Sequence, residues 1–296
     1  MDGDDRVAAL PNGPIRAQGG IGMTKNEIVV RSWSEVCERL YDNAWKPELG
    51  RFRSDYAFRG LADCNYQLQN SFYRICRNNP QLEYHLLRNF KKYGQFADAS
   101  LVSSDWRVLT LAQHHGLPTR LLDWTYSPFV ALHFATDDPT KYDRDGMIWQ
   151  VDYVQVNRML PEPFKGVMEK IGANAFTVEM IEEAVPTLKD FDAFHAQDRD
   201  LVIFFEPPSL DSRIVNQFAF FSVMSTATGG LDEWLYQYPH LYRRIIIPRE
   251  LKWEIRDKLD QANITERILF PGLDGLAKWL LRHYTPRCFH QPEPPG

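Results

Sequence analysis

The sequence predicts an α+β fold in which a central sheet is flanked by helices. Apolar, strand-like runs are separated by amphipathic segments of uneven length, and this spacing favours α+β over a doubly wound parallel sheet. The sequence contains no internal repeat, and it lacks the GxGxxG and Walker loops that commonly cradle nucleotides. With 296 residues, 44% of them hydrophobic, the chain is long enough to bury one large core or two small ones.

Composition excludes several classes of protein. The net charge of -5 argues against a whole-surface affinity for nucleic acid or anionic membranes, although a local basic groove stays open. The four cysteines (Cys37, Cys64, Cys76 and Cys288) form no CxxC pair, so they predict neither a zinc framework nor a required disulfide. No apolar run reaches the roughly 18 residues of a membrane span. The acidic N-terminus lacks a signal-peptide core, so we expect a cytoplasmic protein.

The chain divides into two unequal parts. Residues 1–25 are rich in Gly, Asp, Ala and Pro and show no apolar period, which predicts a disordered leader. Apolar periodicity begins at Asn26 and continues almost to the end of the chain. Residues 26–290 are therefore expected to form one domain.

The first half of this domain predicts strands and helices in alternation. Ser34 is the expected N-cap of the first helix, and Ser127 followed by Pro128 marks the start of a later one. The expected strands cover residues 27–30, 55–60 and 121–124, and the expected helices cover 81–99 and 106–113.

The second half is dominated by apolar strands. Between its first two strands lies a polar stretch, residues 153–200, which is the least informative part and in which we expect short helices near 153–160 and 177–185. The expected strands are 146–152, 201–205, a turn and strand over 213–222, and 241–247, with helices after Pro248 and after Gly275.

The segment 113–135 is the densest concentration of polar groups in the sequence. It places two His, an Arg, an Asp, a Trp, a Thr and a Ser immediately before an apolar helix start. Polar groups crowded against apolar ones need hydrogen-bond partners when they are buried. Fold stability alone does not require so many, so we interpret the segment as the floor of a binding or catalytic site.

Arg59 ends the apolar strand expected over residues 55–60. Its guanidinium needs carbonyl or anionic partners in such a place. One interpretation is a structural ion pair. The other is a clamp for a phosphate or carboxylate, which the planar fork of Arg suits.

Other polar residues also allow two interpretations. Because imidazole in general titrates near neutral pH, His114 and His115 could act as general bases, but paired His at a helix end more often cap carbonyls. No third ligand stands at a spacing that suggests a metal site. Arg120 and Asp123 are expected to pair and brace the loop, and Gln217 is expected to be a buried amide that holds strands together.

These residues resemble the FRG domain family over about residues 26–285. Phe58-Arg59-Gly60 matches the triplet that gives the family its name, and residue 219 is Ala where the family pattern usually has Gly. The further matching segments are 113–135, then Arg213, Gln217 and Phe221, and finally Leu269-Phe270-Pro271 with Leu273-Asp274-Gly275.

The sequence also has a weaker resemblance to the ADP-ribosyltransferases. Residues 56–60 resemble their Arg-bearing first strand, and residues 123–127 with 131–135 resemble their Ser/Thr-bearing strand and helix. Glu266, ahead of 268–271, resembles their catalytic Glu, although it lacks the Gln or Glu that usually precedes it by two residues. This resemblance implies a split, mostly antiparallel mixed sheet flanked by helices.

The same resemblance implies an activity and a set of site residues. NAD would be the substrate, without a metal, and its nicotinamide–ribose bond would be cleaved. Arg59 would bind the pyrophosphate, and Glu266 would stabilise the ribosyl cation. The implied cofactor-binding residues are Phe58, Gly60, His115, Trp124, Thr125 and Ser127. Arg120, Asp123 and Gln217 are expected to brace the site, as argued above from the residues themselves.

Several functions remain open at this point. The chain is expected to be an NAD-dependent ADP-ribosyltransferase or an NAD glycohydrolase, and roles as a toxin or defence effector fit this class. The acceptor, whether protein, nucleic acid or small molecule, and the oligomeric state are not indicated. The alternative is a non-catalytic module that senses nucleotides or binds nucleic acid. Glu206, at the end of a core strand, is a second candidate for the acidic role.

Overall fold

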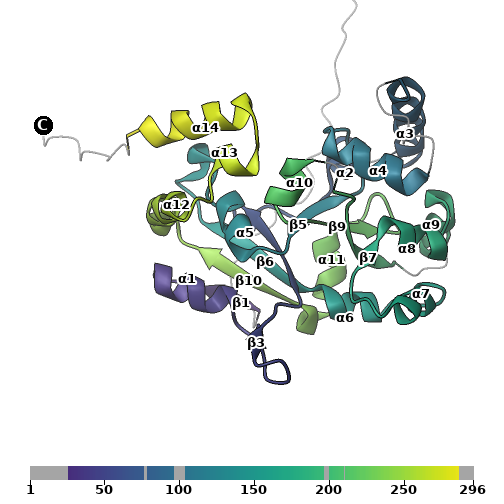
Figure 1. Ribbon diagram of the computed structural model, residues 1–296, viewed down its shortest axis with the longest axis horizontal. Coiled ribbons are helices and arrows are strands. Elements are labelled where there is room, and N and C mark those ends of the chain that lie inside the picture. The colour runs from purple at the N-terminus through teal and green to yellow at the C-terminus, as the bar shows by residue number, and fades with distance from the viewer. Residues whose placement is uncertain (1–25, 77–78, 97–103, 197–199, 210, 287–296) are drawn as a thin grey trace, which may run out of the picture.

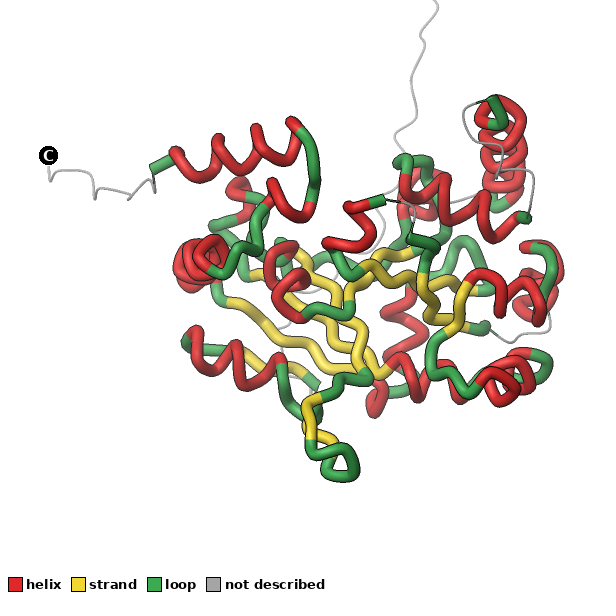
Figure 2. The backbone as a smooth tube through the Cα atoms, in the orientation of Figure 1, coloured by secondary structure: helices red, strands yellow, loops and turns green. Residues whose placement is uncertain are grey.

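The computed structural model describes residues 26–76, 79–96, 104–196, 200–209 and 211–286. The expected leader, Cys288 and the end of the expected domain lie outside these ranges. An eight-stranded sheet forms the centre of the fold (Figures 1 and 2). Its order is β1 (Glu27–Val29), β10 (Tyr242–Ile247), β6 (Gly146–Asp152), β4 (Tyr56–Leu61), β5 (Leu122–Thr125), β9 (Ala219–Met224), β8 (Val202–Glu206) and β7 (Phe176–Thr177). A separate hairpin consists of β2 (Trp45–Lys46) and β3 (Arg51–Phe52).

The sheet is mixed and mostly antiparallel, as predicted. The two outermost pairs, β1 with β10 and β7 with β8, are parallel, and the pairs between them are antiparallel. β4 pairs with β6 along its whole length, but it meets β5 at a single register pair, Phe58 with Thr125. The sheet therefore separates into two four-stranded halves beyond that pair.

Helices cover both faces of the sheet. The α-helices are α1 (Trp33–Leu40), α2 (Ser71–Cys76), α3 (Gln81–Gly94), α4 (Asp105–His114), α5 (Pro128–Phe134), α6 (Tyr153–Arg158), α7 (Phe164–Ile171), α8 (Val178–Ala184), α9 (Leu188–His195), α10 (Ser212–Asn216), α11 (Leu231–Tyr236), α12 (Lys252–Gln261), α13 (Glu266–Leu269) and α14 (Leu273–Tyr284). Short 3-10 turns occupy Pro139–Lys141, Pro239–Leu241 and Arg249–Leu251.

Three apolar clusters join these helices to the sheet. One runs along a whole face, where β4, β5, β6, β8 and β9 pack against α6 and α11. The opposite face is divided: α1, α5 and α12 cover the β4, β6 and β10 half, while α3, α4 and α7 to α9 cover the β8 and β9 half. These two helical groups lie on opposite sides of the molecule in Figure 1. The division falls where β4 and β5 separate.

Local signals placed most helix starts correctly. Ser127 caps α5, accepting a hydrogen bond from the Val130 amide, with Pro128 in the first turn as expected. The first helix instead begins after Ser32, whose hydroxyl accepts from the Glu35 amide, and the expected cap Ser34 lies inside α1. Both serines precede a helix-forming run, so sequence alone does not decide between them.

Gly60 lets α5 approach β4. A Cβ at this position would lie 1.8 Å from the Ala131 carbonyl oxygen and 2.7 Å from the Ala135 amide nitrogen. Both atoms belong to backbone, so neither can move aside as the end of a flexible side chain could. The glycine of the Phe-Arg-Gly triplet therefore has a packing role: it seats α5 against the strand that carries Arg59.

Gly60→Ala should destabilise the fold by about 3 kcal/mol or more, the upper end of the range for overpacked cores, because α5 must shift away from β4. The measurement is the free energy of unfolding from denaturant titration. Gly166→Ala in α7 is the matched control, since its Cβ would meet only the flexible Glu162 side chain. The control should be neutral or slightly stabilising. Equal stability of both variants would contradict this packing role.

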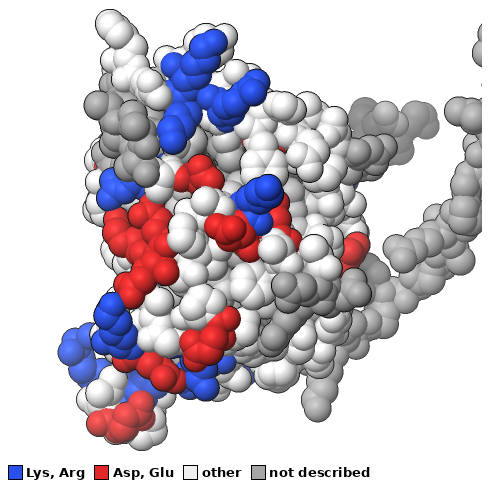
Figure 3. Space-filling view, turned by 90° about the vertical axis from the view of Figure 1, so that its right-hand side faces the viewer, with Lys and Arg blue, Asp and Glu red and all other residues white. Residues whose placement is uncertain are grey.

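The surface around α3, α7 and α9 carries acidic and basic side chains in alternation (Figure 3). This face therefore does not present the continuous basic surface that phosphate neutralisation requires. Among the described helices, none combines the length and the apolar character needed to cross a membrane.

Candidate functional site

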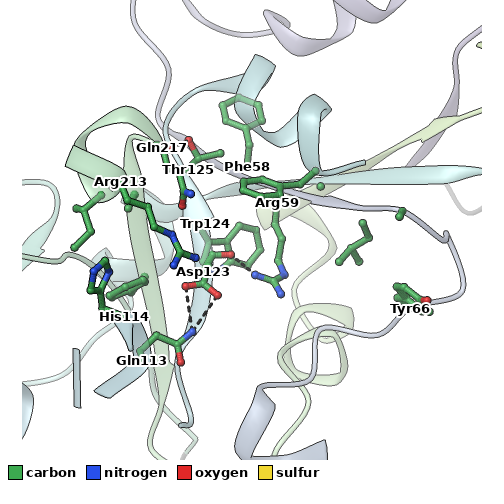
Figure 4. A pocket seen from close by; sticks show the side chains of 17 residues that line it. Phe58, Arg59, Tyr66, Gln113, His114, Asp123, Trp124, Thr125, Arg213 and Gln217 are labelled. Carbon is green, nitrogen blue, oxygen red and sulfur yellow. Dashed lines mark hydrogen bonds between the residues drawn. The ribbon is translucent and has the colours of Figure 1, made fainter. Parts of the chain in front are cut away.

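A cavity of about 300 Å³ lies where β4 and β5 separate (Figure 4). Its wall combines β4, β5, the end of α4, the start of α10 and the start of β9. The lining residues are Phe58, Arg59, Gly60, Leu61, Ala62, Tyr66, Gln113, His114, Asp123, Trp124, Thr125, Phe134, Arg213, Ile214, Gln217, Ala219 and Phe221. Segments that are far apart in the sequence thus meet at one site.

The separation of the two strands exposes both faces of the sheet to this cavity. Successive side chains of a strand point to opposite faces, yet the neighbours Phe58 and Arg59, and likewise Asp123 and Trp124, all line the cavity. A fully paired sheet would keep such neighbours apart. The break in pairing after Phe58 and Thr125 therefore creates the cavity.

Arg59 is held in the cavity wall by the neighbouring strand. Its Nη1 donates a hydrogen bond to the backbone carbonyl of Asp123. Its Nε is buried and has no partner among the described residues. Burial lowers the pKa of this guanidinium, and the charge of Asp123 opposes the shift. Arg59 remains protonated at physiological pH and keeps donor capacity for a ligand.

The carboxylate of Asp123 is oriented by a hydrogen-bond relay. Gln113 Nε2 donates to both Asp123 oxygens at 3.1 and 3.0 Å. The Thr119 hydroxyl donates to Gln113 Oε1 at 2.6 Å, which fixes the direction of the amide. Asp123 itself is exposed to the cavity. Figure 4 shows the Arg59 and Arg213 side chains pointing toward it from opposite sides.

Thr125 and Gln217 link the cavity floor to the C-terminal helices. Thr125 Oγ1 donates to the Gln217 carbonyl at 2.7 Å and accepts from the Ser127 amide at 3.0 Å. Gln217 Nε2 donates to the Leu269 carbonyl at 2.9 Å. Gln217 was expected to be a buried amide between strands, but it is half-buried and its side chain joins the site to α13. Ser127 is committed to capping α5 and does not line the cavity.

Arg120 does not pair with Asp123, contrary to expectation. Its guanidinium is buried and binds Glu83 of α3 and Asp192 of α9. The two residues are three apart in a loop and a short strand, which turn their side chains in different directions. Arg120 thus anchors the loop to the helices behind it, away from the cavity.

Glu266 is also directed away from the cavity. It is 5% exposed and binds Arg282 of α14 at 2.5 and 2.8 Å. Burial raises the pKa of this carboxyl, but the hydrogen bonds and charge of Arg282, aided by Arg256, outweigh it and bring the pKa to about 2. The residue expected to supply catalytic charge is therefore held in an ion pair, and among the described residues the carboxylate that lines the cavity is Asp123.

Glu206, the second acidic candidate, is likewise absent from the cavity wall. Its Oε1 accepts a hydrogen bond from the Tyr126 hydroxyl at 3.0 Å. Burial raises the pKa of Tyr126, and the Glu206 charge adds to that shift, so Tyr126 is a neutral donor. Glu206 is thus the last residue of β8 and does not contact the cavity.

Two polar cavity residues, Gln113 and Arg213, received no site role from the sequence, whereas His114 was considered as a general base together with His115. Gln113 and Arg213 both lie inside segments that carry the family resemblance, but neither was given a role there. His114, rather than His115, lines the cavity, and its Nε2 is 2.9 Å from Asp211 Oδ2. The pairing of Gln113 with a carboxylate ten residues away depends on how the loop folds back, so sequence spacing did not reveal it.

Within the described ranges, no group of three or more His, Cys, Asp or Glu side chains is placed to hold a metal ion.

No curated protein and no solved structure matches the chain. Residues 54–144, which include β4, β5 and the Arg59, Gln113 and Asp123 side chains, match the FRG domain. The match therefore supports assigning this part of the chain to the FRG domain family.

Proposed function

We propose that the chain is an NAD-consuming enzyme, an ADP-ribosyltransferase or glycohydrolase, that cleaves the nicotinamide–ribose bond in the cavity between β4 and β5. One observation carries the proposal. Arg59 and Asp123, a fixed cation and an oriented carboxylate, meet where the sheet separates and line one cavity.

The chemistry of this bond suits a lone carboxylate. Breaking it leaves a ribosyl oxocarbenium cation and releases nicotinamide as a neutral leaving group, so no general acid is required. A carboxylate fixed beside the developing cation stabilises it without reorganising. Asp123 is exposed to the cavity and held by Gln113, whereas Glu266 is bound to Arg282. We therefore give the acidic role to Asp123.

Arg59 is suited to a phosphate of the same ligand. Its planar fork retains donors beyond the one bound to the Asp123 carbonyl, and Arg binds phosphate oxygens through such pairs. The cavity volume of about 300 Å³ is at the small end for ligand sites and suits one nucleotide half. Trp124, Phe134 and Phe221 supply the apolar part of the wall.

The resemblance to ADP-ribosyltransferases supports the proposal in part. It requires the Arg-bearing and Ser/Thr-bearing segments to share a site, and β4 and β5 do line one cavity. The resemblance also assigns the acidic role to Glu266, whereas we assign that role to Asp123. The acceptor stays open between protein, nucleic acid and small molecule.

The test is incubation with NAD labelled in the adenosine half. Release of free nicotinamide supports the proposal, and transfer of label to a second molecule distinguishes the transferase from the glycohydrolase. NAD binding without nicotinamide release would instead favour the nucleotide-sensing module. Absence of both binding and release would contradict the proposal.

Arg59→Lys should weaken NAD binding by about tenfold, because a single ammonium replaces a planar fork at a phosphate. Isothermal titration gives the Kd. Arg88→Lys, at an exposed position of α3, is the matched control and should leave the Kd unchanged. An unchanged Kd in Arg59→Lys would remove Arg59 from the phosphate site.

A further inference from the structure

A second cavity, of about 430 Å³, adjoins the first one. It is formed by the end of α4, by α10 and by the connection from α13 into α14. The two cavities share His114 and Arg213, which stand in the wall between them. The exposed His115, expected to contact the cofactor, lines the second cavity rather than the first. The two cavities therefore adjoin across the His114 and Arg213 side chains.

Two cations lie close to one aromatic ring in the second cavity. The Arg213 guanidinium carbon lies 5.1 Å from the centre of the Phe270 ring, and Lys278 Nζ lies 5.5 Å from it. Neither side-chain cation forms an ion pair or hydrogen bond with another described residue. The ring faces attract and position both cations without neutralising them. Their positive charge remains available to an anionic ligand.

The acidic residues of this cavity are engaged elsewhere or lie at a helix start. Asp211 accepts from the Arg213 and Ile214 amides as the N-cap of α10, and it also binds His114. Asp274 is exposed in the first turn of α14, where the helix dipole favours a negative charge. Arg213 and Lys278 are thus free to bind phosphate oxygens.

We propose that the second cavity binds the adenosine phosphate half of the dinucleotide whose nicotinamide half occupies the first cavity, with Arg213 and Lys278 binding its phosphate oxygens. The inference rests on the proposed function. It follows from two observations. The size of the first cavity suits one nucleotide half, and the adjoining second cavity is lined by Arg213 and Lys278, which have no ion-pair partner among the described residues. Arg213 then contacts the ligand where its two halves join.

The experiment measures binding of three stable probes by isothermal titration. ADP-ribose spans both cavities, AMP reports on the second, and ribose 5-phosphate reports on the first. Lys278→Ala should weaken ADP-ribose and AMP about tenfold, the loss of one charge-assisted contact, and change ribose 5-phosphate less than twofold. Arg59→Lys should instead weaken ribose 5-phosphate and ADP-ribose and leave the affinity for AMP unchanged. Lys92→Ala in α3, an exposed lysine over the Tyr93 ring, is the matched control and should change none.

The outcomes separate the two proposals. If Lys278→Ala leaves AMP and ADP-ribose affinities unchanged while NAD is still cleaved, the second cavity is not the phosphate site and the proposed function stands. If Lys278→Ala weakens AMP and ADP-ribose while NAD is bound but not cleaved, the phosphate site stands and the proposed function fails. If none of the three probes binds the wild-type protein, the second-cavity proposal is overturned. Lys278 is exposed, so its replacement should not impair folding.

Discussion

Asp123→Asn should lower the rate of nicotinamide release from NAD by about 10²- to 10³-fold, the usual effect of removing one preorganised electrostatic contact to a transition state. The Asn side chain has the same shape and still offers an oxygen to Gln113 Nε2, so the loop should keep its conformation. What is lost is the negative charge opposite the developing ribosyl cation. The effect should therefore appear in kcat, with little change in the Kd for NAD.

Two comparisons make this result specific. Asp257→Asn is the matched control: Asp257 is exposed on α12 and does not line the cavity, so kcat should stay unchanged. The unfolding midpoint of Asp123→Asn should fall only slightly, because the carboxylate is exposed and Arg59 keeps its hydrogen bond to the backbone carbonyl of residue 123. If Asp123→Asn retained full turnover, the acidic role would have to be assigned elsewhere.

Much of the fold was predictable because it depends on local pattern. Apolar runs gave the strands β4, β6, β8 and β10, and Ser127 with Pro128 gave the start of α5. The residues around Arg59 and Thr125 were expected to share a site, and they line one cavity. The strands and the helix start depend on neighbours within one strand or one helical turn, so sequence patterns report them directly, whereas the shared cavity was implied by the family resemblance.

The partners of charged side chains were not predictable in this way. Arg120 was expected to bind Asp123, three residues on, yet it binds Glu83 and Asp192, which packing of α3 and α9 brings to it. Glu266 was expected at the reactive centre, yet Arg282 of α14 holds it. Arg120 and Glu266 pair with opposite charges that tertiary packing brings to them, and spacing along the chain does not reveal such distant partners.

Glu266→Ala should destabilise the fold by about 3–5 kcal/mol, because it leaves the Arg282 guanidinium without one of its partners in a buried setting. Arg282 is 7% exposed and binds Glu266 and Asp260 together, which joins α14 to α12 and α13. Denaturant unfolding measures the loss. Glu254→Ala breaks an exposed pair with Lys258 one helical turn away and is the matched control, with an expected change below about 1 kcal/mol.

The pH dependence of stability provides a second measurement on the same pair. The pKa of Glu266 falls from an unfolded value near 4.5 to about 2 in the fold. A depressed carboxyl pKa contributes stability above the unfolded pKa, here about 3 kcal/mol, and this contribution is lost as the pH falls from about 5 to 2. The acid limb of the wild-type stability curve should therefore be steeper than that of Glu266→Gln, which has no such group to protonate.

Turnover by the folded Glu266→Gln variant decides between the two acid assignments. Gln can still accept a hydrogen bond from Arg282, so a substantial folded fraction should remain at neutral pH and low temperature. If Glu266 only joins α13 to α14, kcat per folded molecule should stay within about threefold of wild type, while the unfolding midpoint falls. A loss of 100-fold or more from fully folded protein would return the catalytic role to Glu266, because a carboxylate that acts solely through stability cannot slow molecules that remain folded.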